Sequence, residues 1–169
     1  TGLLLNRGGN DSYTVTGRFP SSYGTPGLFH AFGQGSASGW RGLTPGGLGV
    51  LLDTAGQDHY LAGNFSQGCG YAQAWGLLGD LGAGDDTYDG SRYAQASAAH
   101  GAAGSLWDQG GNDRYRVAQG AQQSAGWDQS ITVLLEDQGN DRYLVPAEGP
   151  GAAQARQSSW SLLRDGGGH

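Results

Sequence analysis

The 169-residue sequence contains no lysine, no methionine and a single cysteine, Cys69. One cysteine cannot form an internal disulfide, so packing, hydrogen bonds or metal ions must hold the fold together. A chain without a disulfide is compatible with the cytosol and with a bacterial exterior. Long apolar stretches are also missing, and without a run of about 18 apolar residues we expect no membrane-spanning helix.

Positive charge and glutamate are scarce. Nine basic residues, all arginine, face fifteen acidic ones, and the formal net charge is -6. This balance argues against a nucleic-acid partner or an anionic membrane, because both need a basic face. Thirteen of the acidic residues are aspartate and only two are glutamate. Aspartate is favoured where a short carboxylate bonds its own turn or a hard cation.

Glycine and aromatic residues are abundant instead. There are 34 glycines, without the period of collagen, and this content indicates many tight turns. Five Trp, eight Tyr and four Phe supply apolar surface that disordered chains lack. The chain has no initiator Met and no visible signal peptide, and it starts and stops inside a repeat. We therefore expect a processed chain or a fragment of a longer one.

One segment recurs along the chain and organises it. Its clearest copy is the stretch 106–115, which reads L-W-D-Q-G-G-N-D-R-Y, and a last copy beginning at Leu162 is cut off. The tyrosines that end the copies follow one another at a nearly constant interval after a longer first one, and they are Tyr13, Tyr60, Tyr88, Tyr115 and Tyr143. A period of about 28 residues, with one long insertion in the first unit, indicates a solenoid or a propeller.

Each unit alternates strands and turns. An apolar pair such as Leu134-Leu135 ends a strand, and the Gly-Gly-Asn-Asp segment turns the chain, because Gly and Asn tolerate positive φ. Tyr115 and Val117 then alternate with polar residues, as expected for an inward-facing strand. A second turn is expected near the pairs Gln67-Gly68, Gln95-Ala96 and Gln119-Gly120.

This pattern predicts a right-handed, single-stranded parallel β-helix with about 28 residues per coil and five to six coils. A propeller blade needs about 40 residues, so the period is too short for one. We expect a single domain over residues 1–169, with residues 16–49 as an insertion rich in glycine and aromatic residues. This insertion is either a packing pad over the side of the helix or a contact surface, with Phe29, Phe32 and Trp40 as a platform for a glycan.

The units resemble those of uncharacterised bacterial Gly/Asp-rich repeat proteins, whose L-L-x-D-x-G-x-D-x-Y units are separated by N-F-S-Q-G, here Asn64 to Gly68. The resemblance covers nearly the whole chain and implies a fold but no activity. The turns also resemble half of the calcium-binding nonapeptide of secreted toxins, because Gly111 to Tyr115 match G-x-D-x-U. Those repeats follow one another without the long spacing seen here, so this second resemblance implies at most single calcium sites at one corner.

Stacking the units predicts two columns of aspartates. At an effective dielectric constant of 20 and a separation of ~5 Å, neighbouring carboxylates repel by about 3 kcal/mol. The N–H groups of the turns could offset this repulsion, so that each Asp only caps its turn. Calcium, with six to eight oxygen ligands, could offset it as well. The candidate calcium ligands are Asp11, Asp53, Asp58, Asp80, Asp86, Asp108, Asp113 and Asp141, with Glu136 as a further member of the second column.

Other chemistry has little support in the sequence. No H-x-H or H-E-x-x-H pattern occurs, which argues against a zinc site, and Cys69 is expected to be a small buried residue. Asp85, Asp86 and Asp89 cluster in the sequence, as an enzyme acting on polysaccharides would require. Asp86, however, lies at a repeated position, and repetition is what structure demands, whereas a single active site would break the pattern.

We therefore expect a non-enzymatic structural or adhesive module from the exterior or envelope of a bacterium, stabilised by calcium. Self-association end to end, or association with other envelope components, is the expected partnership, because open coil edges pair with other chains. The alternative is a carbohydrate-active enzyme or a glycan-binding module on the same scaffold. An unrepeated cluster of polar residues beside the insertion would favour this alternative.

Overall fold

The computed structural model describes residues 1–119, 123–146 and 153–167, and this part of the chain forms seventeen β-strands and no helix. It accordingly holds no helical segment with the length and apolar character needed to cross a bilayer. The strands fall into three parallel sheets and one additional pair.

Neighbouring strands within each sheet come from successive coils. The first sheet contains, in spatial order, β1 (Gly2–Leu5), β5 (Leu48–Asp53), β9 (Trp75–Asp80), β12 (Ala103–Asp108), β15 (Ile131–Glu136) and β17 (Trp160–Asp165). The second contains β2 (Ser12–Val15), β6 (His59–Ala62), β10 (Thr87–Gly90), β13 (Arg114–Val117) and β16 (Arg142–Leu144). The third contains β4 (Ala37–Ser38), β8 (Gly70–Tyr71), β11 (Ala98–Ala99) and β14 (Gly126–Trp127). The pair is β3 (His30–Gly33) with β7 (Asn64–Ser66).

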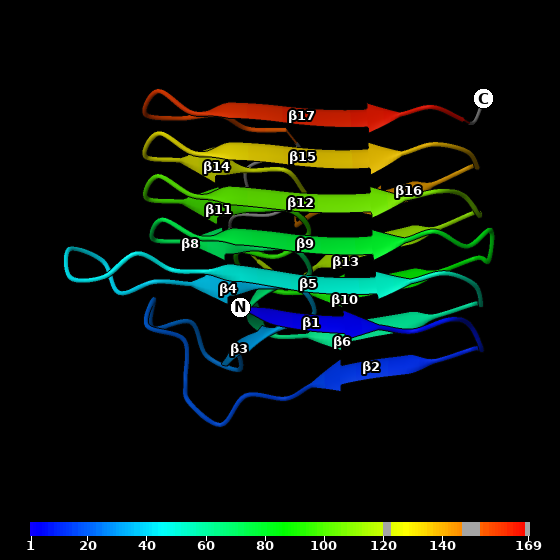
Figure 1. The fold of residues 1–169 in the computed structure, drawn as a ribbon, viewed down its shortest axis with the longest axis horizontal. Coiled ribbons are helices and arrows are strands. Elements are labelled where there is room, and N and C mark those ends of the chain that lie inside the picture. The colour runs from blue at the N-terminus through cyan, green and yellow to red at the C-terminus, as the bar shows by residue number, and fades with distance from the viewer. Residues whose placement is uncertain (120–122, 147–152, 168–169) are drawn as a thin grey trace.

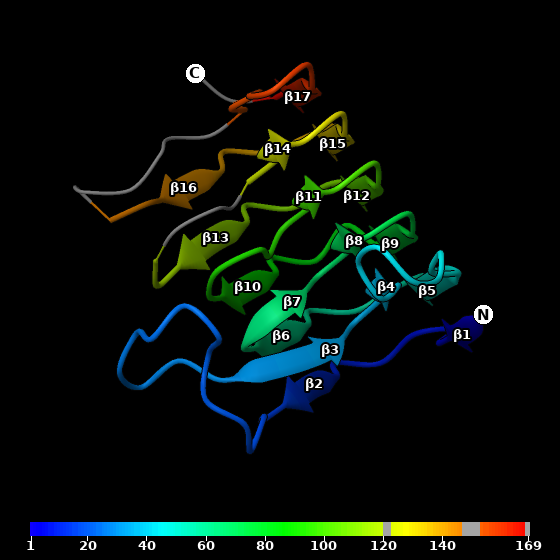
Figure 2. The ribbon, with the colours of Figure 1, turned by 90° about the vertical axis from the view of Figure 1, so that its left-hand side faces the viewer.

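The chain winds as a β-solenoid of about four turns, with roughly 28 residues per coil. Figure 1 looks onto the first sheet, whose strands run to the right, while the second sheet lies behind it with strands running to the left. Figure 2 shows the same layers from the side, with the coils stacked from the N-terminal strand upward. A chain that runs right in front and left behind while it rises winds in the right-handed sense. The fold and the period predicted from the repeats are confirmed, whereas the solenoid has fewer turns than the five to six coils predicted.

Two ladders of like residues fill the interior. The register aligns Leu51 with Leu78, and Leu106 with Leu134, and all four side chains are buried. It also aligns the repeat tyrosines, whose rings stack with centroids 4.7 to 5.0 Å apart and almost parallel planes, as between Tyr88 and Tyr115. This distance is the spacing between strands, so each apolar side chain is buried by its equivalents above and below.

The corner between the first and third sheets is narrow, which explains the glycine within the strands. A Cβ on Gly76 would lie 2.2 Å from the carbonyl oxygen of Cys69, and one on Gly104 would lie 2.4 Å from that of Ser97. Such distances are far below van der Waals contact.

A row of buried glutamines forms hydrogen bonds to the backbone of the second sheet. Gln95 Nε2, for example, donates to two backbone carbonyl oxygens, that of Tyr88 and that of Arg116 on the next coil.

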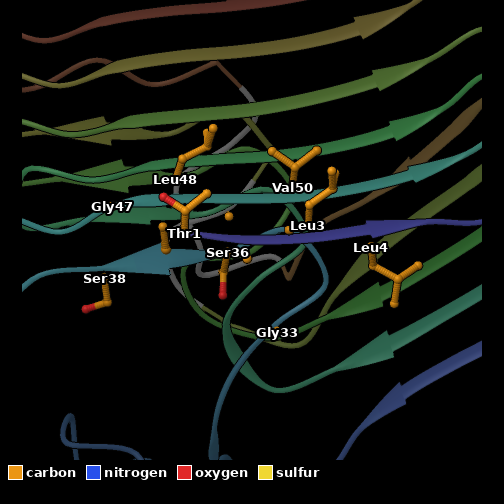
Figure 3. Close-up of a pocket in the computed structure, with 13 residues that line it drawn as sticks. Thr1, Leu3, Leu4, Gly33, Ser36, Ser38, Gly47, Leu48 and Val50 are labelled. Carbon is orange, nitrogen blue, oxygen red and sulfur yellow. The ribbon is translucent and has the colours of Figure 1, made fainter.

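The stretch 16–49 is not one insertion. Residues 30–33 and 37–38 form β3 and β4, which pair with β7 and β8 like the equivalent parts of later coils. Only the segments before β3 and between β4 and β5 are extra loops (Figure 2). The sequence contains the signal for this, because Phe32-Gly33-Gln34-Gly35 repeats the pattern of Phe65-Ser66-Gln67-Gly68. A hollow of about 420 Å³ lies between β1, β4 and β5, and Figure 3 shows residues that line it.

The prediction of the second turn holds in two coils and shifts in the third. Gln67 and Gln95 have positive φ and are buried there. In the next coil Gln123 is buried and has a φ of 50°, whereas Gln119 is exposed. Gln123 Nε2 donates to the carbonyl oxygen of the repeat tyrosine of its coil, as Gln95 does, which identifies the two glutamines as equivalent. Gly120, also predicted at this turn, lies outside the described residues.

Candidate metal centre

One corner of the solenoid, where the first sheet turns into the second, gathers carboxylates from successive coils. The strand-end column consists of the residues that close the strands of the first sheet, which are Asp53, Asp80, Asp108 and Glu136. The turn column consists of the residues that precede the strands of the second sheet, which are Asp11, Asp58, Asp86, Asp113 and Asp141. The repeat thus delivers two carboxylates per coil to the same corner, because both flank its Gly-rich turn.

Carboxylates of the strand-end column have hydrogen bonds to both oxygens. Asp108 Oδ1 accepts the N–H of Gly110 at 3.0 Å, and its Oδ2 accepts the hydroxyl of Tyr88 at 2.6 Å. Asp80 makes the same two contacts with Gly82 and Tyr60. These residues cap the turn and anchor the tyrosine ladder at once.

The turn column is satisfied on one oxygen only. Asp86 Oδ1 accepts the N–H of Asp58 at 2.5 Å, and Asp113 Oδ1 accepts the N–H of Asp86 at 2.5 Å, so each carboxylate bonds the backbone of the preceding coil. The Oδ2 atoms of Asp58, Asp86, Asp113 and Asp141 are buried without a hydrogen-bond partner among the described residues. Asp58, Asp86 and Asp113 are 2, 1 and 1 % exposed, so bulk water does not compensate for the missing partner.

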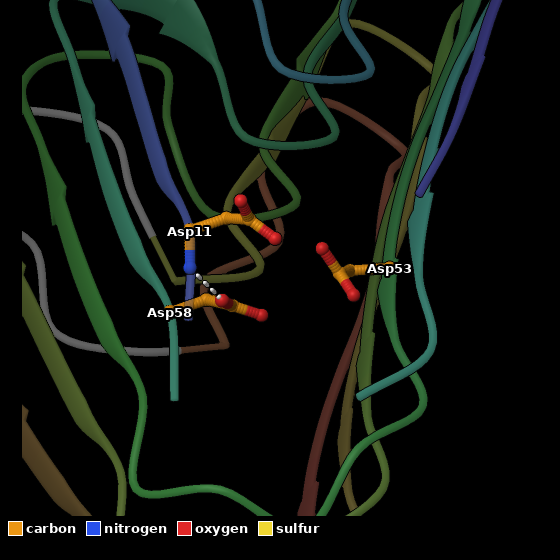
Figure 4. A group of neighbouring side chains, drawn as sticks. All are labelled: Asp11, Asp53 and Asp58. Atoms are coloured by element: carbon orange, nitrogen blue, oxygen red, sulfur yellow. Dashed lines mark hydrogen bonds between the residues drawn. The ribbon is translucent and has the colours of Figure 1, made fainter. Parts of the chain in front are cut away.

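The two columns converge into four overlapping clusters. Figure 4 shows the first cluster, in which Asp11 and Asp58 point across the corner toward Asp53. In every cluster one oxygen from each of three carboxylates lies within 4.8 Å of the other two. Oxygens bound to one calcium ion at ~2.4 Å are at most about 4.8 Å apart, so this spacing fits a shared ion. The other clusters are Asp58 with Asp80 and Asp86, Asp86 with Asp108 and Asp113, and Asp113 with Glu136 and Asp141.

Burial raises the pKa values of these carboxyl groups, because the charged form loses its hydration. The pKa of Asp58 is raised to about 6, and that of Asp86 to about 9. The pKa of Asp113 is raised to about 8 and that of Glu136 to about 9, again mainly by burial and further by neighbouring carboxylates. Without a cation, the groups whose pKa values lie above 7 hold protons at neutral pH.

Basic side chains of the described residues do not neutralise the corner. The ion pairs in this part of the chain are those of Asp89 with His59 and Arg116, and of Asp128 with His100. All of these lie outside the two columns. The described interior therefore offers oxygen ligands and negative charge without a paired positive side chain.

The structure brings together all eight aspartates predicted as metal ligands, and it adds Glu136 as a full member of one cluster. The cluster of Asp85, Asp86 and Asp89 is divided, since Asp86 is buried in the column whereas Asp85 lies at the surface and Asp89 pairs with Arg116. Sequence reasoning missed the tyrosine hydroxyls, which hold the strand-end carboxylates. The period that the aspartates and tyrosines share was the available signal.

The predicted platform residues lie in separate surroundings. Phe29 lines a groove, Phe32 stacks on Phe65 with ring centroids 4.9 Å apart, and Trp40 is 70 % exposed in the loop between β4 and β5. Cys69 is buried, as expected, and burial raises the pKa of its thiol.

Comparison of the chain with protein-family models, with curated proteins and with solved structures gave no match.

Proposed function

We propose that this chain is a non-enzymatic structural module of a bacterial exterior or envelope, a β-solenoid whose interior is held together by calcium ions bound along the carboxylate corner. The observation that carries the proposal is the row of buried Oδ2 atoms, on Asp58, Asp86, Asp113 and Asp141, which lack a hydrogen-bond partner among the described residues. Each is part of a three-carboxylate cluster.

The magnitude of the repulsion supports a bound cation. At a coil spacing of ~4.8 Å and an effective dielectric constant of 20, two neighbouring carboxylates repel by about 3.5 kcal/mol. Five turn-column residues make four such neighbouring pairs, so full ionisation would cost about 14 kcal/mol. A domain of this size is stable by only about 5–15 kcal/mol. The corner must therefore hold either protons or cations, and metal binding displaces protons from such groups.

The donor set favours calcium among the cations. Carboxylate oxygens suit hard ions such as Ca²⁺, Mg²⁺ and Mn²⁺. Mg²⁺ demands near-octahedral geometry and keeps several waters, whereas Ca²⁺ accepts six to eight oxygens in flexible geometry. A buried corner built of carboxylates fits the second behaviour better. Calcium modules outside the cell work at the millimolar calcium of that environment, which supports an exterior location.

Repetition supports a structural role over a catalytic one. The same contacts recur in coil after coil, including the N–H to carboxylate bond and the tyrosine to carboxylate bond. In an active site that uses two carboxyl groups, their surroundings differ, so that one acts as acid and the other as base. Here each cluster combines two turn-column carboxylates with one from the strand-end column.

The first test is calcium titration of metal-free protein, followed by isothermal calorimetry in two buffers of different ionisation enthalpy. We expect binding with release of protons at neutral pH, because the pKa values of Asp86, Asp113 and Glu136 lie above 7. Magnesium serves as the comparison ion and should bind more weakly. Absence of any heat and of any change in thermal midpoint with calcium would reject the metal part of the proposal.

A groove gives the glycan-binding alternative one specific observation. It encloses about 630 Å³ between the loop before β3 and the outer side of the second sheet, and Phe29, Leu61 and Val117 line it beside the ion pair of Arg116 with Asp89. An apolar ring beside fixed polar groups is the composition of many small-molecule sites. Screening of polysaccharide fragments with the parent chain and with Phe29→Ala tests it, and equal binding by both would reject this groove as the site.

A further inference from the structure

The outer face of the first sheet is apolar. Residues 51, 78, 106 and 134 of this sheet point inward, and the alternating positions point outward, where water would normally favour polar side chains. Among the described strand residues of this face, Arg164 is the only charged one and Ser105 is the only polar one, and Asp137 borders the face just beyond the end of β15. Several large side chains are 41–70 % exposed here, namely Leu3, Trp75, Trp107, Ile131 and Trp160.

A continuous apolar face of this kind is rare on a protein that works alone. Figure 1 looks directly onto it, and no described segment crosses in front of the six strands. Every central strand has a hydrogen-bonded neighbour on both sides, so a partner cannot add a strand there and must pack face to face.

Three rows of side chains run across the strands on this face. The start row lies at the beginning of the strands and contains Leu48, Trp75, Ala103, Ile131 and Trp160. The end row lies further along each strand and contains Leu52, Gly79, Trp107, Leu135 and Arg164. The middle row, with Leu77, Ser105 and Val133, lies halfway between them.

On two neighbouring strands of this face, β9 and β12, a tryptophan in one outer row is matched by a small residue in the other. On β9 the start row has Trp75 and the end row has Gly79. On β12 the start row has Ala103 and the end row has Trp107. Exchanging the two outer rows therefore puts each of these tryptophans at the position of a small residue in the same coil.

We propose that this face binds the same face of a second copy of the chain, related by a two-fold axis that runs along the solenoid between the two sheets. Such an axis places each start row against the partner's end row in the same coil. Trp75 then faces the partner's Gly79, and Ala103 faces the partner's Trp107. At the last strand, Trp160 faces the partner's Arg164, a pairing that favours contact between a guanidinium and a ring.

Two of the three tryptophans on this face already have a hydrogen-bond partner for the indole N–H. Trp75 Nε1 donates to Ser105 Oγ at 3.1 Å, and Trp107 Nε1 donates to Asp137 Oδ2 at 2.9 Å. Because both indole N–H groups already have partners within the chain, a second copy can cover the rings without leaving a donor unsatisfied.

The area is sufficient for a dimer. Six strands at ~4.8 Å spacing and three rows at about 6.6 Å spacing cover roughly 25 by 20 Å, or about 500 Å² per copy. Two copies would bury on the order of 1,000 Å², which is the lower bound for a specific interface. A partner that recognises charge would find little on the described strands of this face, where Arg164 is the only charged residue, whereas a second copy offers the same apolar rows in return.

The test is the solution mass of the chain by analytical ultracentrifugation over a wide concentration range. We expect a monomer–dimer equilibrium that closes at two copies, whereas the end-to-end association predicted from the sequence would continue to larger masses. Ala103→Trp should weaken the dimer at least tenfold, because two tryptophans then face each other. The double variant Ala103→Trp with Trp107→Ala exchanges the large and small positions and should restore the dimer.

A pair of glutamate substitutions provides the control for nonspecific effects. Ile131→Glu lies on the outer face of the first sheet and should abolish the dimer, while Leu144→Glu lies exposed on β16 in the second sheet and should leave it unchanged. Circular dichroism confirms that each variant keeps the fold. A chain that stays monomeric at the highest concentration, or a dimer that tolerates Ile131→Glu, overturns the proposal. If the single variant Ala103→Trp dimerises with the same dissociation constant as the parent chain, the two-fold arrangement is wrong.

Discussion

Replacing Asp86 by asparagine gives the sharpest test of the carboxylate corner. Asp86 belongs to two clusters, is 1 % exposed, and has one hydrogen-bonded oxygen and one buried oxygen without a partner among the described residues. The asparagine carbonyl can still accept the N–H of Asp58, so the hydrogen bond to the preceding coil is kept. The substitution removes only the charge and one metal ligand from each of the two clusters.

Two opposite effects are expected from Asp86→Asn. In excess chelator above pH 9, where the carboxyl would ionise, the variant avoids two repulsions of about 3.5 kcal/mol each and should be the more stable protein. In calcium the order should reverse. One ion at a free concentration about a hundredfold above its Kd stabilises the fold by about 2.7 kcal/mol. For a chain of this length that corresponds to a rise in Tm of about 5–11 °C, which the variant should largely lose.

The assay is thermal unfolding followed by circular dichroism, with the parent chain, Asp86→Asn and Asp85→Asn measured in calcium and in chelator. Asp85 is the matched control, because it is adjacent in sequence but accepts hydrogen bonds from Asn112 on the surface. Asp85→Asn should respond to calcium like the parent. If Asp86→Asn gains as much from calcium as the parent does, or if Asp85→Asn loses as much, the reasoning about the interior ligands is wrong.

Three further outcomes follow from the same contacts. In chelator, the free energy of unfolding should fall as pH rises from about 4 to 9, because the carboxyl pKa values in the folded chain are raised above those in the unfolded chain. In saturating calcium, it should instead fall as pH drops. Thermal unfolding at several pH values checks both signs. Tyr88→Phe should cost about 1–2 kcal/mol in urea unfolding, because buried Asp108 Oδ2 loses the shorter of its two tyrosine hydrogen bonds. Tyr143→Phe, whose hydroxyl has no partner among the described residues, should be neutral or stabilising. Gly76→Ala should lower stability by more than about 3 kcal/mol or prevent folding, since its Cβ would meet backbone at 2.2 Å, while Gly2→Ala, with open space around it, should change little on the same urea curves.

The period of the sequence was sufficient to predict the fold and most of the candidate site. Aspartates and tyrosines that recur once per unit must form columns when coils stack, because the register of a parallel sheet aligns equivalent residues. The prediction of a single insertion over 16–49 was wrong for residues 30–38, because two short strands without long apolar runs are hard to recognise between glycine-rich loops. Glu136 joined the cluster because its longer side chain still ends at the corner.

Some features depend on how sheets meet in space and could not be predicted. Which carboxylate oxygens have partners is decided by the distance between β6 and the end of β9 across the corner, and not by spacing in the sequence. The complementarity of Trp75 with Gly79 and of Ala103 with Trp107 likewise exists only after the strands are in register. A strand that is apolar on both faces is read from sequence as buried, since nothing in the chain itself marks one face as outward.

The sequence by itself determined the coil length, the ladders and the acidic corner, because a repeat of nearly constant length has one way to align its equivalents. Tertiary structure decided which of these residues lack partners. Asp86 turns inward and Asp85 lies at the surface, so two adjacent residues have opposite environments. The physical reason is that burial, and with it the raised pKa of Asp86, arises from neighbouring coils that are distant along the chain.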